Sequence, residues 1–194
     1  MGLIERFFSE QMEQKEQETP IKRVFIELGA GHRPLPTEGD KTFSENDIYV
    51  GVDMDEERLK KGRSETQKGE KSSEKQNMYF VRGDATKLPL GSGISDEIFL
   101  RNILGDPGIT QEIKDGFLNE AGRIAKDNGR LIIEETYTPR RLKEVRDILR
   151  QHGFIVERVE KISEKHSPFP DWDESFTYRV FAQKRPAKTK ALFS

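Results

Sequence analysis

The sequence contains no cysteine, only three histidines and no long run of apolar residues. Without cysteine, disulfide bonds, thiolate metal ligands and a cysteine nucleophile are excluded. The histidines, His32, His152 and His166, are too scattered to predict a zinc site, so we expect no metal cofactor. The first residues carry Glu5 and lack the apolar run of a signal peptide or transmembrane helix. We therefore expect a cytoplasmic protein with no membrane partner.

The composition favours a single well-solvated domain. The 194 residues suffice for a full core, while apolar residues make up 33% and charged residues 35% of the chain. The formal net charge of −2 provides no overall field that would attract nucleic acid. A large RNA partner is therefore less expected than a small molecule, although a local basic patch would be enough to bind RNA.

An apolar stretch that ends in a glycine turn organises the chain. Val24–Leu28 has the β-branched and aromatic residues of a buried strand, and Gly29-Ala30-Gly31 follows at once. Glycine allows a sharp turn and lets the backbone approach a ligand without a Cβ atom in the way. We expect a ligand loop at this strand end.

Further strands and helices alternate along the chain. The predicted strands are residues 48–52, 78–82, 97–100, 130–135, 154–159 and 176–183. The predicted helices are residues 110–126, closed by a turn at Asn128-Gly129, residues 140–152, stopped by Gly153, and a helix that begins with residues 56–61. This alternation predicts an α/β domain with a mainly parallel sheet that ends in a hairpin-like pair of strands.

Four segments fall outside this pattern. Residues 1–19 predict an amphipathic helix that packs on the domain core or acts as a lid or dimer contact. Residues 32–47 predict a loop, because their prolines and glycine defeat a helical period. Residues 63–77 contain no apolar residue and predict a solvated linker, and residues 186–194 form a tail. The domain itself spans residues 20–185.

Acidic residues end successive strands, where parallel sheets bind their ligands. Asp53 could accept hydrogen bonds from the vicinal hydroxyls of a ribose, or cap the next helix, a role that Asp55 could equally fill. Asp84 could read an adenine amino group while the Ala85 amide donates to a ring nitrogen, or it could simply form a turn. Glu27 lies inside an apolar strand and requires a cationic or amide partner, which a ligand ammonium group would provide.

Six stretches occur in a characteristic order. They are Glu27-Leu-Gly-Ala-Gly31, Gly51-Val-Asp53-Met, Gly83-Asp84-Ala85-Thr-Lys-Leu-Pro-Leu90, Asp96-Glu-Ile-Phe-Leu100, residues 117–133 and Gln151-His-Gly-Phe154. Their order and spacing resemble the successive motifs of class I S-adenosylmethionine-dependent methyltransferases, over about residues 22 to 184. The resemblance implies a Rossmann-like three-layer sandwich with a mainly parallel seven-stranded sheet whose last strand is antiparallel.

The resemblance also implies a cofactor, S-adenosyl-L-methionine, and a role for each matching residue. Residues 29–31 would pass under its methionine part, with Glu27 at the amino group. Residues 53–54 would contact the ribose and adenine, residues 84–85 the adenine edge, and residues 101–103 the region of the sulfonium and substrate. The implied cofactor-binding positions are Glu27, Gly29, Ala30, Gly31, Asp53, Met54, Asp84, Ala85, Arg101 and Asn102.

The sequence departs from the family pattern in two places. His32–Pro36 opens a loop where the family usually has a helix, which leaves the pocket wall there undefined. Asn102 is not followed by a Pro-Pro-aromatic sequence, so methylation of exocyclic base nitrogens is not expected, and the absence of cysteine excludes covalent cytosine-C5 chemistry. Dinucleotide binding is disfavoured, because the third glycine and the helix N-terminus that would hold a pyrophosphate are missing.

The expected function is methyl transfer to an unidentified acceptor, with a small molecule favoured and RNA or protein left open. Positioning can supply most of the acceleration, and a base is needed only if the acceptor loses a proton. The candidate bases at strand ends are His32, Asp106, Glu135 and Tyr137. Each has a structural alternative: Asp106 could start a turn, Glu135 could pair with an arginine, and the others could pack locally. The competing hypothesis is a non-catalytic methyltransferase-like module that acts through a partner protein.

Overall fold

A computed structural model describes residues 23–37, 43–68, 77–137, 139–163 and 176–186. Its elements are β1 (Val24–Leu28), the 3-10 helix η1 (Leu35–Thr37), β2 (Ile48–Asp53), α2 (Glu56–Lys68), β3 (Met78–Arg82), β4 (Ser95–Arg101), α3 (Gln111–Ile124), β5 (Ala125–Tyr137), α4 (Pro139–Gln151), β6 (Phe154–Ser163) and β7 (Phe176–Lys184). The helix predicted over residues 1–19 and the tail beyond residue 186 lie outside the described residues. Within the described part, none of the helices combines the length and hydrophobicity that a membrane crossing requires.

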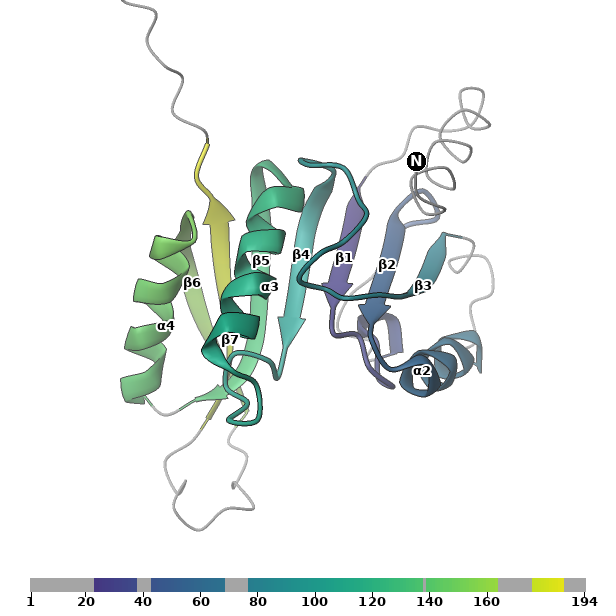
Figure 1. Cartoon of the computed structure of the whole chain (residues 1–194), viewed down its shortest axis with the longest axis horizontal. Coiled ribbons are helices and arrows are strands. Elements are labelled where there is room, and N and C mark those ends of the chain that lie inside the picture. Colours follow the sequence, from purple (N-terminus) through teal and green to yellow (C-terminus); the bar gives the residue numbers. More distant parts are fainter. Residues whose placement is uncertain (1–22, 38–42, 69–76, 138, 164–175, 187–194) are drawn as a thin grey trace, which may run out of the picture.

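The strands form one seven-stranded sheet in the order β3-β2-β1-β4-β5-β7-β6. Strand β1 pairs in parallel with β2 and β4, whereas β7 runs antiparallel between β5 and β6. In Figure 1 the arrowheads of β1, β2 and β4 point down and that of β7 points up. The predicted mainly parallel sheet with an antiparallel last strand is confirmed.

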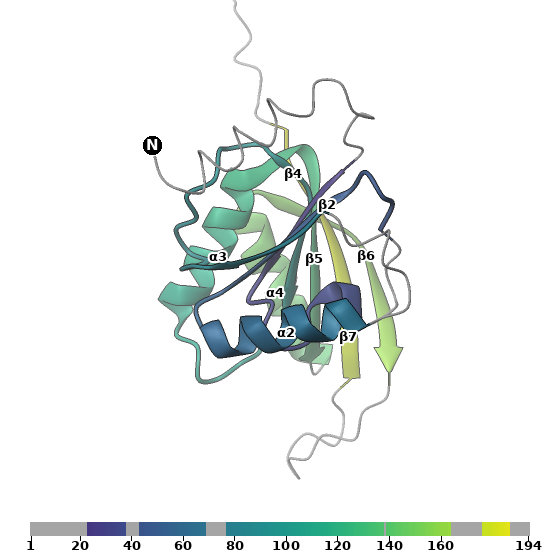
Figure 2. The same cartoon turned by 90° about the vertical axis from the view of Figure 1, so that its right-hand side faces the viewer.

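The strand order reverses at β1. The chain first moves from β1 through β2 to β3, and then returns past β1 to continue with β4 and β5 on the other side. Right-handed crossovers therefore put the connecting segments on opposite faces of the sheet on the two sides of β1. Helices α3 and α4 share one face, and α2 packs beside β2, β3 and η1 (Figures 1 and 2). Sheets of this kind bind ligands at the carboxyl ends of the strands next to such a reversal.

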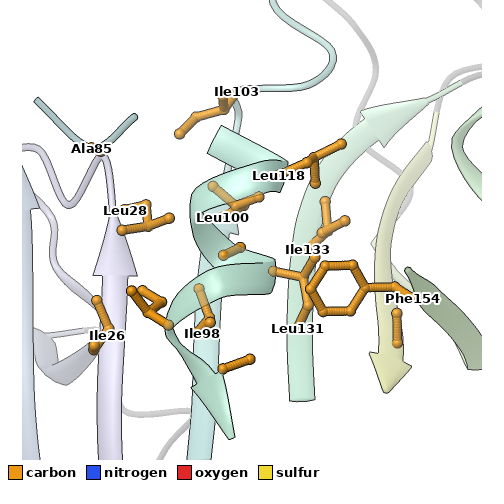
Figure 3. Packing of buried hydrophobic residues seen from close by; sticks show 14 of the residues in the cluster. Ile26, Leu28, Ala85, Ile98, Leu100, Ile103, Leu118, Leu131, Ile133 and Phe154 are labelled. Carbon is orange, nitrogen blue, oxygen red and sulfur yellow. The ribbon is translucent and has the colours of Figure 1, made fainter. Parts of the chain in front are cut away.

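The larger hydrophobic cluster packs α3 and α4 onto the sheet. Leu28, Leu100, Leu118 and Ile133 are fully buried members of it, and Figure 3 shows them between the strands and α3. Burial of large aliphatic side chains stabilises such an interface by about 1.5–3 kcal/mol for each residue. This face is the main core of the domain.

A smaller cluster lies on the opposite face. Phe25, Tyr49 and Phe99 project from β1, β2 and β4, and Leu35 and Phe43 of the first crossover cover them. The rings of Phe25 and Phe43 meet edge to face with centroids 5.0 Å apart. The segment after β1 is thus a packed loop, as its prolines predicted, and η1 is the only regular element among its described residues, 32–37 and 43–47.

The linker predicted over residues 63–77 is wrong for residues 63–68, because α2 continues to Lys68, and residues 69–76 lie outside the described residues. The buried face of α2 is made by Leu59, Gly62 and Thr66, at helical spacing. Gly62 has no side chain and Thr66 is polar, so the composition of this segment predicted no buried helix face. A Cβ atom at Gly62 would lie 2.9 Å from the carbonyl oxygen of Gly31 and 3.0 Å from Cδ of Pro34, so the helix packs directly on the glycine loop.

The turn predicted at Asn128-Gly129 does not close α3. The helix ends at Ile124, and β5 begins at Ala125 without a connecting loop. Asn128 has a φ of 65° inside the strand, where the pairing with β4 shifts register between Ser95 and Glu97. Residues that favour positive φ can form a bulge as well as a turn, which explains the error.

The packing of α3 can be tested by a large-to-small substitution. Leu118→Ala should lower the free energy of unfolding by about 2–5 kcal/mol, because the side chain is fully buried and leaves a cavity. Ile113→Ala on the same helix is the matched control, since Ile113 is 45% exposed and should change stability by less than about 1 kcal/mol. Urea titrations followed by circular dichroism measure both values, and equal losses would contradict this packing.

Candidate functional site

The glycine turn after β1 is tied to the end of β2. The backbone N–H groups of Gly29 and Ala30 both donate to the carbonyl oxygen of Val52, at 2.8 and 2.9 Å. The Gly31 N–H donates to Oδ2 of Asp53 at 2.8 Å. Gly29 and Gly31 have φ values of 76° and 59°, which glycine adopts without strain. The structure therefore brings two predicted site motifs into direct contact.

Asp53 retains capacity for a ligand. Its Oδ2 accepts from Gly31, and its Oδ1 accepts from the N–H of Asp55 at 2.9 Å. Because each carboxylate oxygen has two lone pairs, both oxygen atoms can accept a further hydrogen bond. The capping role belongs to Asp55, whose Oδ1 accepts from the N–H groups of Glu57 and Arg58. The alternative role that the sequence left open for Asp53 is thus filled by its neighbour.

The loop after β3 lies beside this corner of the sheet. The N–H of Gly83 donates to the carbonyl oxygen of Asp53 at 3.0 Å, so Asp84 and Ala85 follow directly from that contact. Oδ1 of Asp84 accepts from both the N–H and the hydroxyl of Thr86, and these bonds lower the pKa of Asp84 below its ordinary value. Ala85 is buried and Asp84 is exposed. Asp84 is thus a turn acid that stays ionised at the edge of the site.

Met54 is the most exposed large apolar side chain of the described residues, at 69%. It directly follows Asp53 at the end of β2. An exposed thioether side chain next to a polar strand end offers an apolar surface to a flat ligand group.

Glu27 is completely buried and is held entirely by the chain itself. Its Oε2 accepts from the hydroxyl of Tyr49 and from the N–H of Leu35 at 2.8 Å, and its Oε1 accepts from Nε of Arg101 at 2.7 Å. Burial raises the pKa of Glu27, and Arg101 with the two other donors opposes that rise. Burial and the neighbouring carboxylate also raise the pKa of Tyr49 well above its ordinary value. The predicted contact of Glu27 with a ligand amino group stays a prediction.

Arg101 joins two parts of the site. Its guanidinium forms an ion pair with Glu27, in which Nη2 lies 2.6 Å from Oε1, and it also donates to the carbonyl oxygen of Arg33. The Arg101 side chain is only 10% exposed. The sequence did not pair Arg101 with Glu27, and it did not include Tyr49 in the site. A tyrosine hydroxyl inside an apolar strand is the signal that could have found this cluster, because such a group needs a partner.

The loop after β4 completes the carboxyl edge. Asn102 has a φ of 54°, an uncommon value for a residue other than glycine, and its N–H donates to the carbonyl oxygen of Glu134 at 3.0 Å. Ile103 lies against the glycine turn, with its Cδ1 2.7 Å from the position that a Cβ atom on Gly29 would take. Figure 3 shows Ile103 and Ala85 beyond Leu28, at the carboxyl end of β1. The two loops are therefore in close contact.

Glu135, predicted as a possible base or arginine partner, has a different role in the structure. Its Oε1 accepts from the N–H groups of Ile103 and Leu104, and its Oε2 accepts from the N–H of Gly105 at 3.0 Å. Burial raises the pKa of Glu135 to about 7 despite these three hydrogen bonds. The structural alternative of an ion pair with arginine is wrong, because backbone amides take that place.

The other candidate bases are less enclosed. His32 is exposed and lines a hollow of about 410 Å³ with Arg33, Thr37, Lys61 and Glu65. Asp106 is exposed and its Oδ1 accepts from the N–H of Gly108 at 2.7 Å, which is the turn that the sequence proposed as the alternative. The side chain of Tyr137 lies outside the described residues. No group of three or more acidic or histidine side chains suited to a metal ion occurs in the described ranges.

Comparison with known sequences identifies the family. A family model described as "Methyltransferase domain" matches residues 23–183. The chain belongs to this methyltransferase family. No curated protein sequence matches the chain.

Solved structures share the fold of this methyltransferase-family chain. A SAM-dependent methyltransferase from Methanosarcina mazei aligns with a TM-score of 0.62 and 12% identity, over 87% of this chain and 95% of that one. An antibiotic-related methyltransferase aligns with a TM-score of 0.64 and 20% identity, over 94% and 96% of the two chains. The cyclase SpnF aligns with a TM-score of 0.65 and 14% identity, over 93% and 81%. At these identities the likeness establishes the fold alone.

The Glu27–Arg101 ion pair should be essential for stability. Arg101→Leu should lower the free energy of unfolding by about 3–5 kcal/mol, because it leaves a buried carboxylate without its cation. Arg82→Leu is the control, since the Arg82–Glu56 pair is exposed and should contribute less than about 1 kcal/mol. Both values come from urea titrations at neutral pH. A loss in Arg101→Leu no larger than that of the control would refute the role assigned to this pair.

The pKa of Glu135 predicts a pH dependence of stability. The native state keeps this proton up to about pH 7, whereas the unfolded chain loses it near the ordinary value of 4.5. The stabilisation is thus complete below about 4.5 and is lost as the pH rises through about 7, a difference of roughly 3 kcal/mol. The unfolding free energy of the wild type relative to Glu135→Gln should therefore fall over this range in urea titrations. A constant difference would contradict the raised pKa.

Proposed function

We propose that this protein binds S-adenosyl-L-methionine and transfers its methyl group to a small-molecule acceptor. The observation that carries the proposal is the contact between the Gly29–Gly31 turn and Asp53, at the carboxyl edge where the strand order reverses. The turn provides backbone that can approach a ligand, and Asp53 has acceptor capacity for two ribose hydroxyls. The residues fit a nucleoside ligand without a phosphate group, since η1 is too short to offer a helix N-terminus.

Each matching residue has a proposed role toward the cofactor. The glycine turn would lie under the methionine part, and Asp53 would accept hydrogen bonds from the ribose. Met54 would cover the adenine with its exposed side chain, and Asp84 and Ala85 would read the adenine edge. Asn102 would lie near the sulfonium. These roles rest on the family resemblance together with the contacts that the site residues make with one another.

The charge on Arg101 is compatible with a neighbouring sulfonium. A lone guanidinium would repel the positive sulfur, but the buried carboxylate of Glu27 neutralises Arg101 at 2.6 Å. Four donor contacts already occupy the two oxygen atoms of Glu27, from Tyr49, Leu35 and the Nε and Nη2 groups of Arg101. We therefore propose that Glu27 acts mainly by holding the crossover loop, and that any contact with the methionine amino group is made through water or after a donor moves away.

Methyl transfer from a bound sulfonium is an in-line displacement, so the protein must mainly align donor and acceptor and exclude water. The cofactor supplies the activated methyl group. The chain supplies Asp53 and the two loops that fix the cofactor's orientation. His32 is the exposed candidate base nearest to the glycine turn in sequence, and it would act only if the acceptor loses a proton.

A small molecule is favoured as acceptor because the chain has a formal net charge of −2 and a pI of about 6.0, which provides little attraction for RNA. RNA and protein acceptors remain alternatives, and the cytoplasmic location stays a prediction. The fold by itself does not fix the reaction, since the similar structure of SpnF is described as that of a cyclase. A non-catalytic binding module is the competing function.

Isothermal titration with S-adenosylmethionine and S-adenosylhomocysteine tests the cofactor. Binding by the wild type is expected, and Asp53→Ala should weaken it at least about tenfold, because two hydrogen bonds to a charged acceptor are lost. Asp127→Ala is the control, since this exposed residue lies near the start of β5, away from the carboxyl edge. Absence of heat from a folded wild type would refute the proposal, and equal affinities of wild type and Asp53→Ala would remove the ribose assignment.

A second experiment separates enzyme from binding module. Wild-type protein is incubated with S-adenosylmethionine that carries a tritiated methyl group, together with pools of small metabolites, protein or RNA. Label in the small-molecule fraction supports the proposal, and label in RNA or protein redirects the acceptor class. Tight cofactor binding with no label in any fraction would favour the module.

A further inference from the structure

A buried carboxylate on β5 accepts hydrogen bonds from the loop that follows β4. Glu135 is only 2% exposed, and its oxygen atoms accept from three successive backbone N–H groups, those of Ile103, Leu104 and Gly105. No ion pair joins Glu135 to another side chain within the described ranges. Burying a carboxylate without an ion-pair partner costs free energy, and hydrogen bonds from the loop amides offset part of that cost.

The loop packs closely against the carboxylate of Glu135. A Cβ atom on Gly105 would lie 2.6 Å from Oε2 of Glu135, so a larger residue at this position would have to displace the carboxylate. On its other side the loop packs Ile103 against Gly29, and Cδ1 of Ile103 occupies the space that a Cβ atom on Gly29 would need. Glu135 is thereby connected through Ile103 to the glycine turn.

We propose that Glu135 is a positioning residue for methyl transfer: its ionised carboxylate fixes the Asn102–Gly105 loop against the Gly29 turn and so shapes the sulfonium side of the pocket. The proposal rests on the proposed function. It assigns Glu135 no contact with substrate, so Glu135 acts through the loop and not as a base.

Protonation should loosen the loop. The ionised carboxylate offers four lone-pair sites to the three N–H donors, whereas the protonated form has fewer and adds an O–H that needs its own acceptor. Lys114 of α3 favours the ionised form, Tyr178 lies opposite Glu135 in the β5–β7 pairing, and Asp106 is an exposed acid of the same loop. Since the pKa of Glu135 is about 7, the change falls near neutral pH.

The proposal makes a prediction that a purely structural residue would not. Acidification through about pH 7 should stabilise the whole fold, as derived above, while it weakens cofactor binding. If only the ionised form binds, the dissociation constant for S-adenosylhomocysteine should rise about tenfold between about pH 8 and about pH 6. Stability and affinity would therefore move in opposite directions. If Glu135 only supported the fold, affinity would follow stability or stay constant.

The experiment compares the full-length wild type with Glu135→Gln, and with Glu134→Gln as a matched control. Glu134 precedes Glu135 on the same strand, but its side chain pairs with Arg179 and does not reach the loop amides. Calorimetric titration with S-adenosylhomocysteine at about pH 6 and about pH 8 gives the affinities. Amide exchange measured by NMR gives protection factors for residues 103–105. Glu135→Gln should lose that protection and bind weakly at both pH values, whereas Glu134→Gln should behave as the wild type.

The outcomes separate the two proposals. If the protection of residues 103–105 is unchanged in Glu135→Gln, or does not fall on acidification of the wild type, the positioning role is refuted. If the amides respond as expected but neither the wild type nor any variant binds S-adenosylhomocysteine, the proposed function fails and the link to methyl transfer is overturned, while the anchoring by Glu135 stands. If Glu135→Gln does not fold, the pH series of the wild type alone decides, because it needs no substitution.

Discussion

The buried carboxylate of Glu27 is the interaction on which the rest of the carboxyl edge depends. It joins β1 to Tyr49 of β2, to Arg101 of β4 and to the N–H of Leu35 in the first crossover. Since β1 is the strand at which the order reverses, this single side chain connects both halves of the sheet with the loop above them. Breaking one such contact leaves a charge or donor buried and unpaired, which is why the cluster acts as a unit.

A second carboxylate repeats this arrangement on the other side of the reversal. Glu27 holds the loop after β1, and Glu135 holds the loop after β4. Loops at ligand sites need fixed positions but cannot be fixed by a packed core, because they must face the ligand. Buried carboxylates that accept backbone N–H groups solve this problem here, and both lie near the ends of their strands.

Much of the fold follows from local patterns in the sequence. Apolar runs ended by glycine or aspartate marked the parallel strands, and β3 has the bounds that its pattern predicted. The errors come from residues with two possible uses. Asn128 has the positive φ of a turn but lies in a bulge of β5, and α2 buries Gly62 and Thr66 where a search for apolar residues finds no helix face.

The candidate site was predicted less completely than the fold. Glycine and acidic residues that directly follow apolar runs predicted the strand ends that form the site, and the contact of Gly31 with Asp53 joins two of them. It could not pair Glu27 with Arg101, which is 74 residues away, or direct Glu135 to the amides of another loop. Such pairings depend on strand register, which becomes known only once the sheet is assembled.

The contact between α2 and the glycine loop has a consequence for how this chain can vary. The short 3-10 helix η1 is the only helix in the described part of the loop after β1, and the missing side chain at Gly62 sets how closely α2 approaches Gly31 and Pro34. The helix thus serves as a spacer for the glycine loop. One residue inserted between Glu56 and Gly62 would rotate the helix by about 100° and turn a bulkier side chain toward that loop. Changes in chain length after Lys68 would leave this spacing intact, so the first turns of α2 are the length-sensitive part of the domain.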